Sequence, residues 1–263
     1  MSFIAAAVPA GGAGSRANRR AAQVIQSWQA PERHSLQRTL ALHLAPGALL
    51  TLAFLLGAPQ VVRAGASSYL ALLLCIPLVL VPVEVGILVV EGRRTGHRWR
   101  FLTACGGRSR LSVGETLLSV AALYLIAAAA TLLVAPCRPV VLSALSGWLP
   151  PWAIVDSLPA GVSRGTLWFG LAFSGLVAPV VEELYFRGFL LPRIPVGGAW
   201  APAVNAALFS IYHFFSPWNY AAIFVAFLPL AYYVRLRGRL LPVIISHCLF
   251  NGLGIAGALA GVS

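Results

Sequence analysis

The stretch from Thr166 to Leu191 reads TLWFGLAFSGLVAPVVEELYFRGFLL and places two adjacent glutamates, Glu182 and Glu183, inside a run of apolar residues. The whole chain has only 7 acidic residues among 263. A carboxylate at bilayer depth costs roughly 2.5–3.5 kcal/mol even on the most lenient insertion scale, so an acid in such a run indicates a functional site. Two adjacent carboxyl groups rarely ionise together, which suits acid–base chemistry.

The composition around this stretch is typical of a polytopic membrane protein. The chain is 59% hydrophobic and 10% charged, whereas a soluble domain has about 25% charged residues. The net charge is +12 and all 19 basic residues are arginine. These arginines lie in short clusters between apolar segments, a pattern that the positive-inside rule explains better than nucleic-acid binding does. We therefore expect the lipid bilayer as a partner, and no nucleic acid.

Seven apolar segments approach the length of about 20 residues that spans a bilayer core. A further apolar segment, residues 139–160, is interrupted by Pro150 and Pro151. It is predicted to be an interfacial or re-entrant piece, with an eighth span as the alternative. The sequence thus predicts an all-α transmembrane bundle of about seven helices. The seven predicted spans are residues 39–57, 69–91, 113–135, 166–191, 199–215, 218–234 and 240–261.

Arginine-rich segments alternate with arginine-poor segments along the chain. With seven spans, every rich segment falls on one side of the membrane, which the positive-inside rule makes the cytoplasmic side. We therefore expect a multi-pass protein of the cytoplasmic membrane, with its amino terminus inside and its carboxyl terminus outside. The rich segments hold Arg16, Arg19, Arg20, Arg33 and Arg38, then Arg93, Arg94, Arg98, Arg100, Arg108 and Arg110, then Arg235, Arg237 and Arg239; the poor ones hold Arg63, Arg138 and Arg164.

Arg187 follows the two glutamates at the spacing of a helical ion pair. Glu183 and Arg187 are four residues apart with the acid on the amino-terminal side, the order that such pairs prefer. Glu182 lies about 100° further round the helix, so Arg187 can hold one acid while the other faces elsewhere. Glu182 is then the working carboxylate. The alternative is that all three residues form a charged cluster at the cytoplasmic end of the helix.

Two more polar pairs lie in apolar segments. Phe209 and His213 are four residues apart in ALFSIYHFF. His247 and Asn251 have the same spacing in VIISHCLFNGLG. A single histidine in an apolar helix is usually a packing residue, but polar side chains at bilayer depth tend to face a common interior or a water-filled cavity. At about 1.5 Å per residue, Glu182 and both histidines lie within the roughly 30 Å hydrocarbon core. We expect them to line one cavity, open to the cytoplasm.

These residues also carry a family resemblance. The E-E-x-x-x-R of residues 182–187, the F-x-x-x-H of residues 209–213 and the H-x-x-x-N of residues 247–251 resemble the three motifs of the CPBP family. That family comprises the type II CAAX prenyl proteases and the bacteriocin-processing, or Abi, proteins. The resemblance covers about residues 166–254. Composition and this resemblance together divide the chain into an arginine-containing cytoplasmic arm (1–38), amino-terminal transmembrane helices with their loops (39–165) and a protease core (166–263).

The resemblance implies an intramembrane glutamic endopeptidase that needs no cofactor. Glu182 would activate a water molecule, His213 would orient it, and His247 with Asn251 would form the oxyanion site. Its substrate would be a membrane-associated protein or peptide, such as a carboxyl-terminal sorting tail or a bacteriocin leader. Buried carboxyl, imidazole and amide groups suit these roles on chemical grounds as well. The sequence sets no oligomeric state.

Three other functions are compatible with part of this pattern. A zinc protease would use glutamate and histidine ligands, although the H-E-x-x-H spacing of the zincins is absent. A non-catalytic immunity or scaffold protein would keep the fold without using the site, yet it would have no need of so many costly buried polar groups. A transporter usually shows paired repeats with interrupted helices, and no internal repeat stands out in this sequence.

Overall fold

A computed structural model of the chain describes residues 32–94, 111–155 and 161–261, which belong to one compact unit, Pro31–Ser263. Within these ranges all regular structure is helical. Residues 1–31, most of the loop that follows the second predicted span, and Ser263 lie outside the described residues. So do the predictions that the amino-terminal arm is cytoplasmic and that the carboxyl terminus is external.

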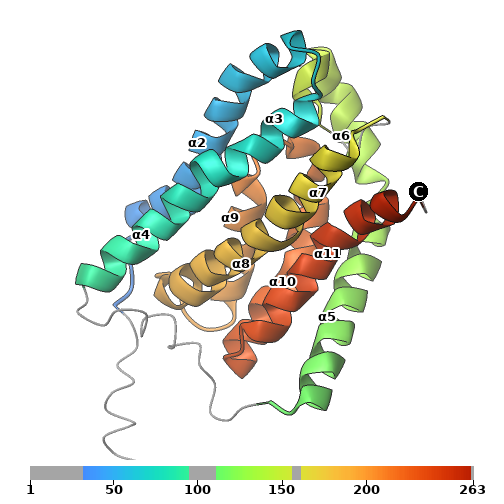
Figure 1. The fold of residues 1–263 in the computed structure, drawn as a ribbon. Coiled ribbons are helices and arrows are strands. Elements are labelled where there is room, and N and C mark those ends of the chain that lie inside the picture. The colour runs from blue at the N-terminus through green and yellow to red at the C-terminus, as the bar shows by residue number, and fades with distance from the viewer. Residues whose placement is uncertain (1–31, 95–110, 156–160, 262–263) are drawn as a thin grey trace, which may run out of the picture. The chain divides into compact units, whose positions relative to one another are not determined.

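Six helical segments among the described residues are long and apolar enough to cross a membrane. They run side by side as a bundle (Figure 1). The chain is therefore a multi-pass membrane protein, as the composition predicts. The six are α2 (Leu36–Arg63), α3–η1–α4 (Ser68–Cys75, Ile76–Leu80, Val81–Arg94), α5 (Val113–Val134), α7–η5–α8–η6–η7 (Arg164–Ala172, Phe173–Val177, Ala178–Glu182, Glu183–Leu190, Leu191–Arg193), η8–α10 (Pro217–Asn219, Tyr220–Arg237) and α11 (Leu241–Ala260).

Two of the apolar segments form shorter helices. The predicted span 199–215 contains α9 (Trp200–Tyr212), whose 13 residues reach only about 20 Å at 1.5 Å per residue, less than a bilayer core. The prediction of a full helical span here is corrected, because α9 ends at Tyr212 and the chain continues through a turn. In the segment 139–160, α6 (Cys137–Ser146) is followed by the short η4 (Pro151–Ala153), and neither is long enough to span.

Prolines explain two wide turns in the spanning helices. The N–H of Val81 donates to the carbonyl of Ile76, and the N–H of Ala178 donates to the carbonyl of Phe173, each five residues back. The next residue in both cases is a proline, Pro82 or Pro179. A proline has no N–H and crowds the preceding turn, so a π-helical turn is a natural accommodation. Both wide turns, η1 and η5, face the interior of the bundle at the cavity described below.

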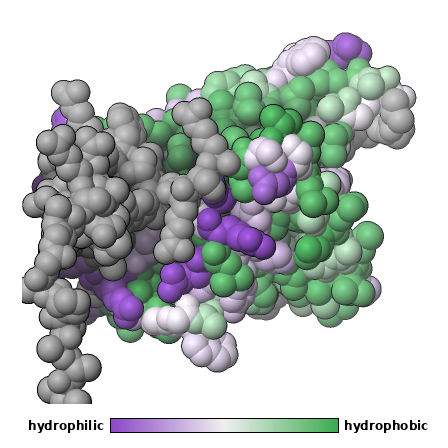
Figure 2. All heavy atoms as spheres, turned by 90° about the horizontal axis from the view of Figure 1, so that it is seen from below, coloured by the Kyte–Doolittle hydropathy of each residue, from purple (hydrophilic) through white to green (hydrophobic). Residues whose placement is uncertain are grey.

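The arginines of the described residues gather at one end of the bundle. Arg38, at the start of α2, contacts Glu91 near the end of α4 at 2.6 Å. The backbone N–H of His34 donates to the carbonyl of Arg193 at 2.8 Å, and the hydroxyl of Tyr232, towards the end of α10, donates to the carbonyl of Ala199. We call this the arginine-rich end. Figure 2 views it directly and shows hydrophilic residues beside hydrophobic flanks. Its arginines are Arg33, Arg38, Arg93, Arg94, Arg193, Arg235, Arg237 and Arg239.

The opposite end holds the remaining described arginines apart from the buried Arg187. The Nε of Arg138 donates to Asn219 at 3.2 Å, which joins α6 to η8. Arg164, at the start of α7, donates to the carbonyl of Leu259 near the end of α11 at 3.3 Å. Arg63 ends α2 on the same side. The predicted alternation of arginine-rich and arginine-poor connections is therefore present in the packed structure.

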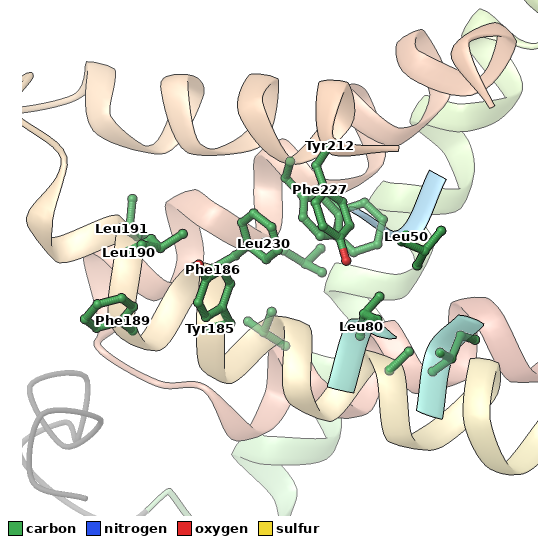
Figure 3. Close-up of a cluster of buried hydrophobic side chains, with 14 of the residues drawn as sticks. Leu50, Leu80, Tyr185, Phe186, Phe189, Leu190, Leu191, Tyr212, Phe227 and Leu230 are labelled. Carbon is green, nitrogen blue, oxygen red and sulfur yellow. The ribbon is translucent and has the colours of Figure 1, made fainter. Parts of the chain in front are cut away.

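A run of buried side chains lies in η6, between the two glutamates and the arginine-rich end. Tyr185, Phe186, Phe189 and Leu190 are all fully buried. Figure 3 shows these side chains within one apolar cluster. The hydroxyl of Tyr185 also donates to the carbonyl of Leu42, which ties η6 to α2. We call these four residues the packed layer; burying two phenylalanines, a tyrosine and a leucine contributes strongly to holding the bundle together.

Candidate active site

Glu182 and Glu183 lie at the junction of α8 and η6, where their side chains take different surroundings. Both are buried, Glu182 with 5% and Glu183 with 0% of the residue exposed. Glu183 lies 3.3 Å from the guanidinium of Arg187. That guanidinium also lies 4.1 Å above the ring of Phe209. Glu182 instead lines a cavity. The two side chains thus face different directions, as the helical spacing predicts, and the two glutamates are not a surface boundary cluster.

His247 on α11 connects the two carboxylates. Its Nδ1 lies 2.9 Å from Oε1 of Glu183, and its Nε2 lies 3.7 Å from Oε2 of Glu182. Because a carboxylate accepts hydrogen bonds, Nδ1 carries a hydrogen and Glu183 fixes the orientation of the ring. The Nε2 atom is therefore directed towards Glu182 and the cavity.

His213 comes directly after the last residue of α9. Its φ and ψ of −80° and 51° are not helical. Its Nδ1 lies 2.8 Å from the carbonyl oxygen of Phe209, so Nδ1 donates and the neutral ring keeps a lone pair on Nε2. The ring lines the same cavity as Glu182. The F-x-x-x-H spacing therefore joins the two residues through this backbone contact and through their rings, whose centroids lie 4.9 Å apart in an edge-to-face arrangement.

Asn251 is held by a carbonyl that the wide turn in η5 leaves available. Its Nδ2 donates to the carbonyl of Ser174 at 3.2 Å. In a π-helical turn that carbonyl would accept from the residue five positions on, which is Pro179 and has no N–H. An amide nitrogen carries two hydrogens, so Asn251 keeps one for a group in the cavity. Asn251 lines the cavity together with His247.

Two further residues belong to this cluster and were not singled out from the sequence. The hydroxyl of Tyr212 lies 3.0 Å from Oε1 of Glu84 and 3.3 Å from Oε1 of Glu182. Glu84 is on α4 and is 0% exposed. The signal that identified Glu182 also applies to Glu84, an acid within the apolar run VPVEVGILVV. In the sequence, Glu84 lies shortly before Arg93 and Arg94. It therefore looks like a charged residue at the membrane boundary and not like part of a site.

The cavity measures about 580 Å³ and is bounded by all four candidate groups that face it, Glu182, His213, His247 and Asn251. Glu183 and Arg187 lie behind its wall. Its other walls come from the half of the bundle away from the arginine-rich end, the end that the positive-inside rule assigns to the cytoplasm, whereas a cavity open to the cytoplasm was expected. These walls include Leu50, Tyr69, Leu72, Leu73, Ile76, Leu80, Thr131, Val155, Ser174, Phe215, Ser216, Asn219, Ala222, Ile223, Phe227, Phe250, Gly254 and Ile255.

Comparison with known proteins now adds to this geometry. Residues 164–253 match the family model of the type II CAAX prenyl endopeptidases, Rce1-like. Over this region the chain is similar to that protease family. The match confirms the resemblance seen in the three motifs, and the Rce1-like region contains all six predicted site residues. Glu84 lies outside it. No curated protein and no solved structure matches the chain.

Within the described residues, no group of three or more histidine, cysteine, aspartate or glutamate side chains is placed to hold a metal ion. The two carboxylates and His247 are instead engaged with one another and with Arg187 and Tyr212.

Proposed function

We propose that this protein is an intramembrane glutamic endopeptidase that hydrolyses a peptide bond of a membrane-associated protein or peptide. The observation that carries the proposal is that Glu182, His213, His247 and Asn251 line one cavity, although they come from three separate helical segments. The similarity of residues 164–253 to a protease family supports it.

In the proposed reaction, a water molecule in the cavity is held by the carboxylate of Glu182 and the free lone pair of His213. Glu182 takes a proton as the water oxygen bonds to the peptide carbon. The carbonyl oxygen becomes an oxyanion, which accepts hydrogen bonds from Asn251 and His247. The C–N bond then breaks, and the proton held by Glu182 passes to the leaving amine. Carboxylic acid and amine products result, with no net consumption of protons at the site.

Glu183 and Arg187 do not line the cavity but position His247 and balance its charge. Donation from Nε2 of His247 requires the doubly protonated imidazole, because Nδ1 already donates to Glu183. The charge of Glu183 balances that cation, and Arg187 balances Glu183 when His247 is neutral. Buried charges are costly unless paired in this way. We therefore assign Glu183 and Arg187 a positioning role.

The proposed location is the cytoplasmic membrane, with the arginine-rich end at the cytoplasm and the amino terminus inside. This orientation rests on the positive-inside rule and on the gathering of the arginines at one end of the bundle. The substrates that we favour are bacterial membrane peptides, such as sorting tails or bacteriocin leaders.

The oxyanion role of Asn251 is tested by Asn251→Ala. We expect kcat to fall on the order of 10²–10³-fold with little change in KM, the size seen when one oxyanion donor is lost. The measurement needs a substrate, which can be found as a membrane peptide that accumulates in cells producing only Glu182→Gln. Asn219→Ala is the matched control, since Asn219 also lines the cavity but binds Arg138.

Two results would count against the proposal. Wild-type turnover by Asn251→Ala on a verified substrate would remove the oxyanion role. Loss of activity on exhaustive chelation, with recovery on adding Zn²⁺, would replace the glutamic mechanism by a metal-dependent one. If no peptide accumulates and the purified protein cleaves none, a scaffold or immunity function is favoured instead.

A further inference from the structure

The cavity lies on one side of the site only. All helix ends that contribute to its wall belong to the half opposite the arginine-rich end: the start of α3 with Tyr69, the end of α5 with Thr131, and the start of α10 with Ala222. On the other side of Glu182 the packed layer fills the bundle, with each of its four side chains fully buried. Figure 3 shows this layer beside Tyr212 and Phe227, which border the cavity.

The arginines give this asymmetry a direction with respect to the membrane. Eight described arginines lie at the arginine-rich end and three, Arg63, Arg138 and Arg164, at the other. The positive-inside rule places the richer end in the cytoplasm. The hollow half of the bundle then faces the extracytoplasmic side, and the packed layer separates the site from the cytoplasm. A cytoplasmic substrate could reach Glu182 only if this aromatic packing opened.

The cavity wall indicates what could enter. Leu72, Leu73 and Ile76 form an apolar stretch on α3 and η1, and Ile223 and Phe250 add to it from α10 and α11. Glu182 is the one acidic residue among the described residues of the wall, and no arginine lines it. Such a wall favours apolar side chains close to the scissile bond and offers nothing to bind an acidic chain.

We propose that the cavity takes its substrate from the extracytoplasmic side, and that this substrate is an apolar peptide segment presented at the outer leaflet. The proposal rests on the proposed endopeptidase function for the nature of the cleaved bond. The side of the membrane from which the substrate enters is inferred without any assumption about catalysis. A lipid-modified chain end in the cytoplasm would meet the arginine-rich end and the packed layer, and is therefore not expected to be cleaved.

Cysteine labelling in intact cells tests the direction of access. Native Cys137 is exposed at the start of α6 on the arginine-poor side. In a background where the other cysteines are replaced by alanine, a small membrane-impermeant thiol reagent is expected to label Cys137 without permeabilisation. A Cys137→Ala background then receives Ala222→Cys or Arg237→Cys. These positions lie near the two ends of α10, so one helix supplies both the cavity probe and its control.

We expect Ala222→Cys to be labelled in intact cells and Arg237→Cys only after permeabilisation. The reverse pattern, or no labelling of Ala222→Cys from either side, would overturn the proposal. Labelling needs no turnover, so this result is separate from the fate of the endopeptidase proposal. If the labelling follows the expected pattern but no peptide is cleaved, only the endopeptidase function is rejected. If the labelling pattern is reversed but a peptide is cleaved, only the extracytoplasmic direction of access is rejected.

A second, independent inference concerns Glu84 and the protonation of the carboxyl groups that contact the Tyr212 hydroxyl. The Tyr212 hydroxyl lies within hydrogen-bond distance of carboxyl oxygens of both Glu84 and Glu182. A phenol has one hydrogen and can donate to only one of them. The second contact is favourable only if a carboxyl group donates to the phenol oxygen. Glu183 pairs with the buried guanidinium of Arg187, and Glu84 and Glu182 interact with the same guanidinium electrostatically, so three carboxylate charges there would be costly.

We infer that Glu84 is a positioning residue for Glu182. Glu84 keeps its proton and donates to Tyr212, and Tyr212 donates to the ionised Glu182. The chain of two hydrogen bonds holds the carboxylate towards the cavity. Glu84 thereby links α4, outside the Rce1-like region, to the reaction centre.

Infrared spectra of purified protein test the protonation without any substrate. Glu84→Gln should remove a carboxylic-acid C=O band from the wild-type spectrum, and Tyr212→Phe should shift that band. An unchanged spectrum in both variants would overturn the inference. On a verified substrate, Glu84→Leu and Tyr212→Phe should each lower kcat on the order of tenfold with KM unchanged, the effect of one lost hydrogen bond. Glu84→Gln should recover most of the rate, because its amide can donate to Tyr212; equal loss in Glu84→Gln and Glu84→Leu would contradict the role.

Discussion

Glu182→Gln is expected to lower the hydrolysis rate by at least 10²–10⁴-fold, about the contribution of a positioned general base. The amide has nearly the shape of the carboxylate, and its oxygen can still accept from the Tyr212 hydroxyl 3.3 Å away. It cannot take the proton of the attacking water. The protein should therefore remain folded and monodisperse in detergent while peptide cleavage is lost. Single-turnover cleavage of a verified substrate is the measurement.

Glu115→Gln provides a matched control for this change. Glu115 accepts from Ser112 in the capping box at the start of α5. It is exposed, and it lies at the opposite end of α5 from Thr131, the residue of this helix that lines the cavity. Glutamine also serves at this position of a capping box, so the variant should keep wild-type activity and stability. Turnover by Glu182→Gln at the rate of Glu115→Gln would remove Glu182 from the role of base.

Arg187→Ala is expected to have the largest effect on folding. Arg187 is 0% exposed, pairs with Glu183 at 3.3 Å and packs on the rings of Phe209 and Phe227. Removing one partner of a buried ion pair typically costs about 3–5 kcal/mol, because the other charge remains in an apolar environment. His247 still contacts Glu183, so part of that charge stays compensated. The thermal unfolding midpoint in detergent should fall markedly, together with activity.

A double variant separates the charge effect from lost packing. Glu183→Gln combined with Arg187→Met removes both charges and keeps an apolar side chain against Phe209. Its stability should be much closer to wild type than that of Arg187→Ala, as is found when both members of a buried pair are replaced. Arg63→Ala, an exposed arginine at the end of α2, should leave the midpoint unchanged. An Arg187→Ala midpoint equal to that of Arg63→Ala would contradict the structural role of the buried pair.

The sequence by itself determined the class of fold and marked the residues of the candidate site. Runs of apolar residues long enough for a bilayer core are local properties, so six of the seven predicted spans correspond to helical segments of membrane length, and only the span 199–215 does not. The cost of an acid in such a run marked Glu182 and Glu183, and motif spacing marked His213, His247 and Asn251. The alternation of arginines also follows from chain order alone.

Only the tertiary structure decided which group faces which. The rotation and packing of the helices direct Glu182 into the cavity and Glu183 towards Arg187 and His247, and no one-dimensional pattern contains that information. Hydropathy could not show that α9 ends before His213, because the apolar composition continues through the turn. Glu84 reaches the site through Tyr212, 128 residues away in the chain. The position of the cavity likewise depends on aromatic packing on one side of Glu182 and on proline-associated wide turns on the other, which become neighbours only when the helices assemble.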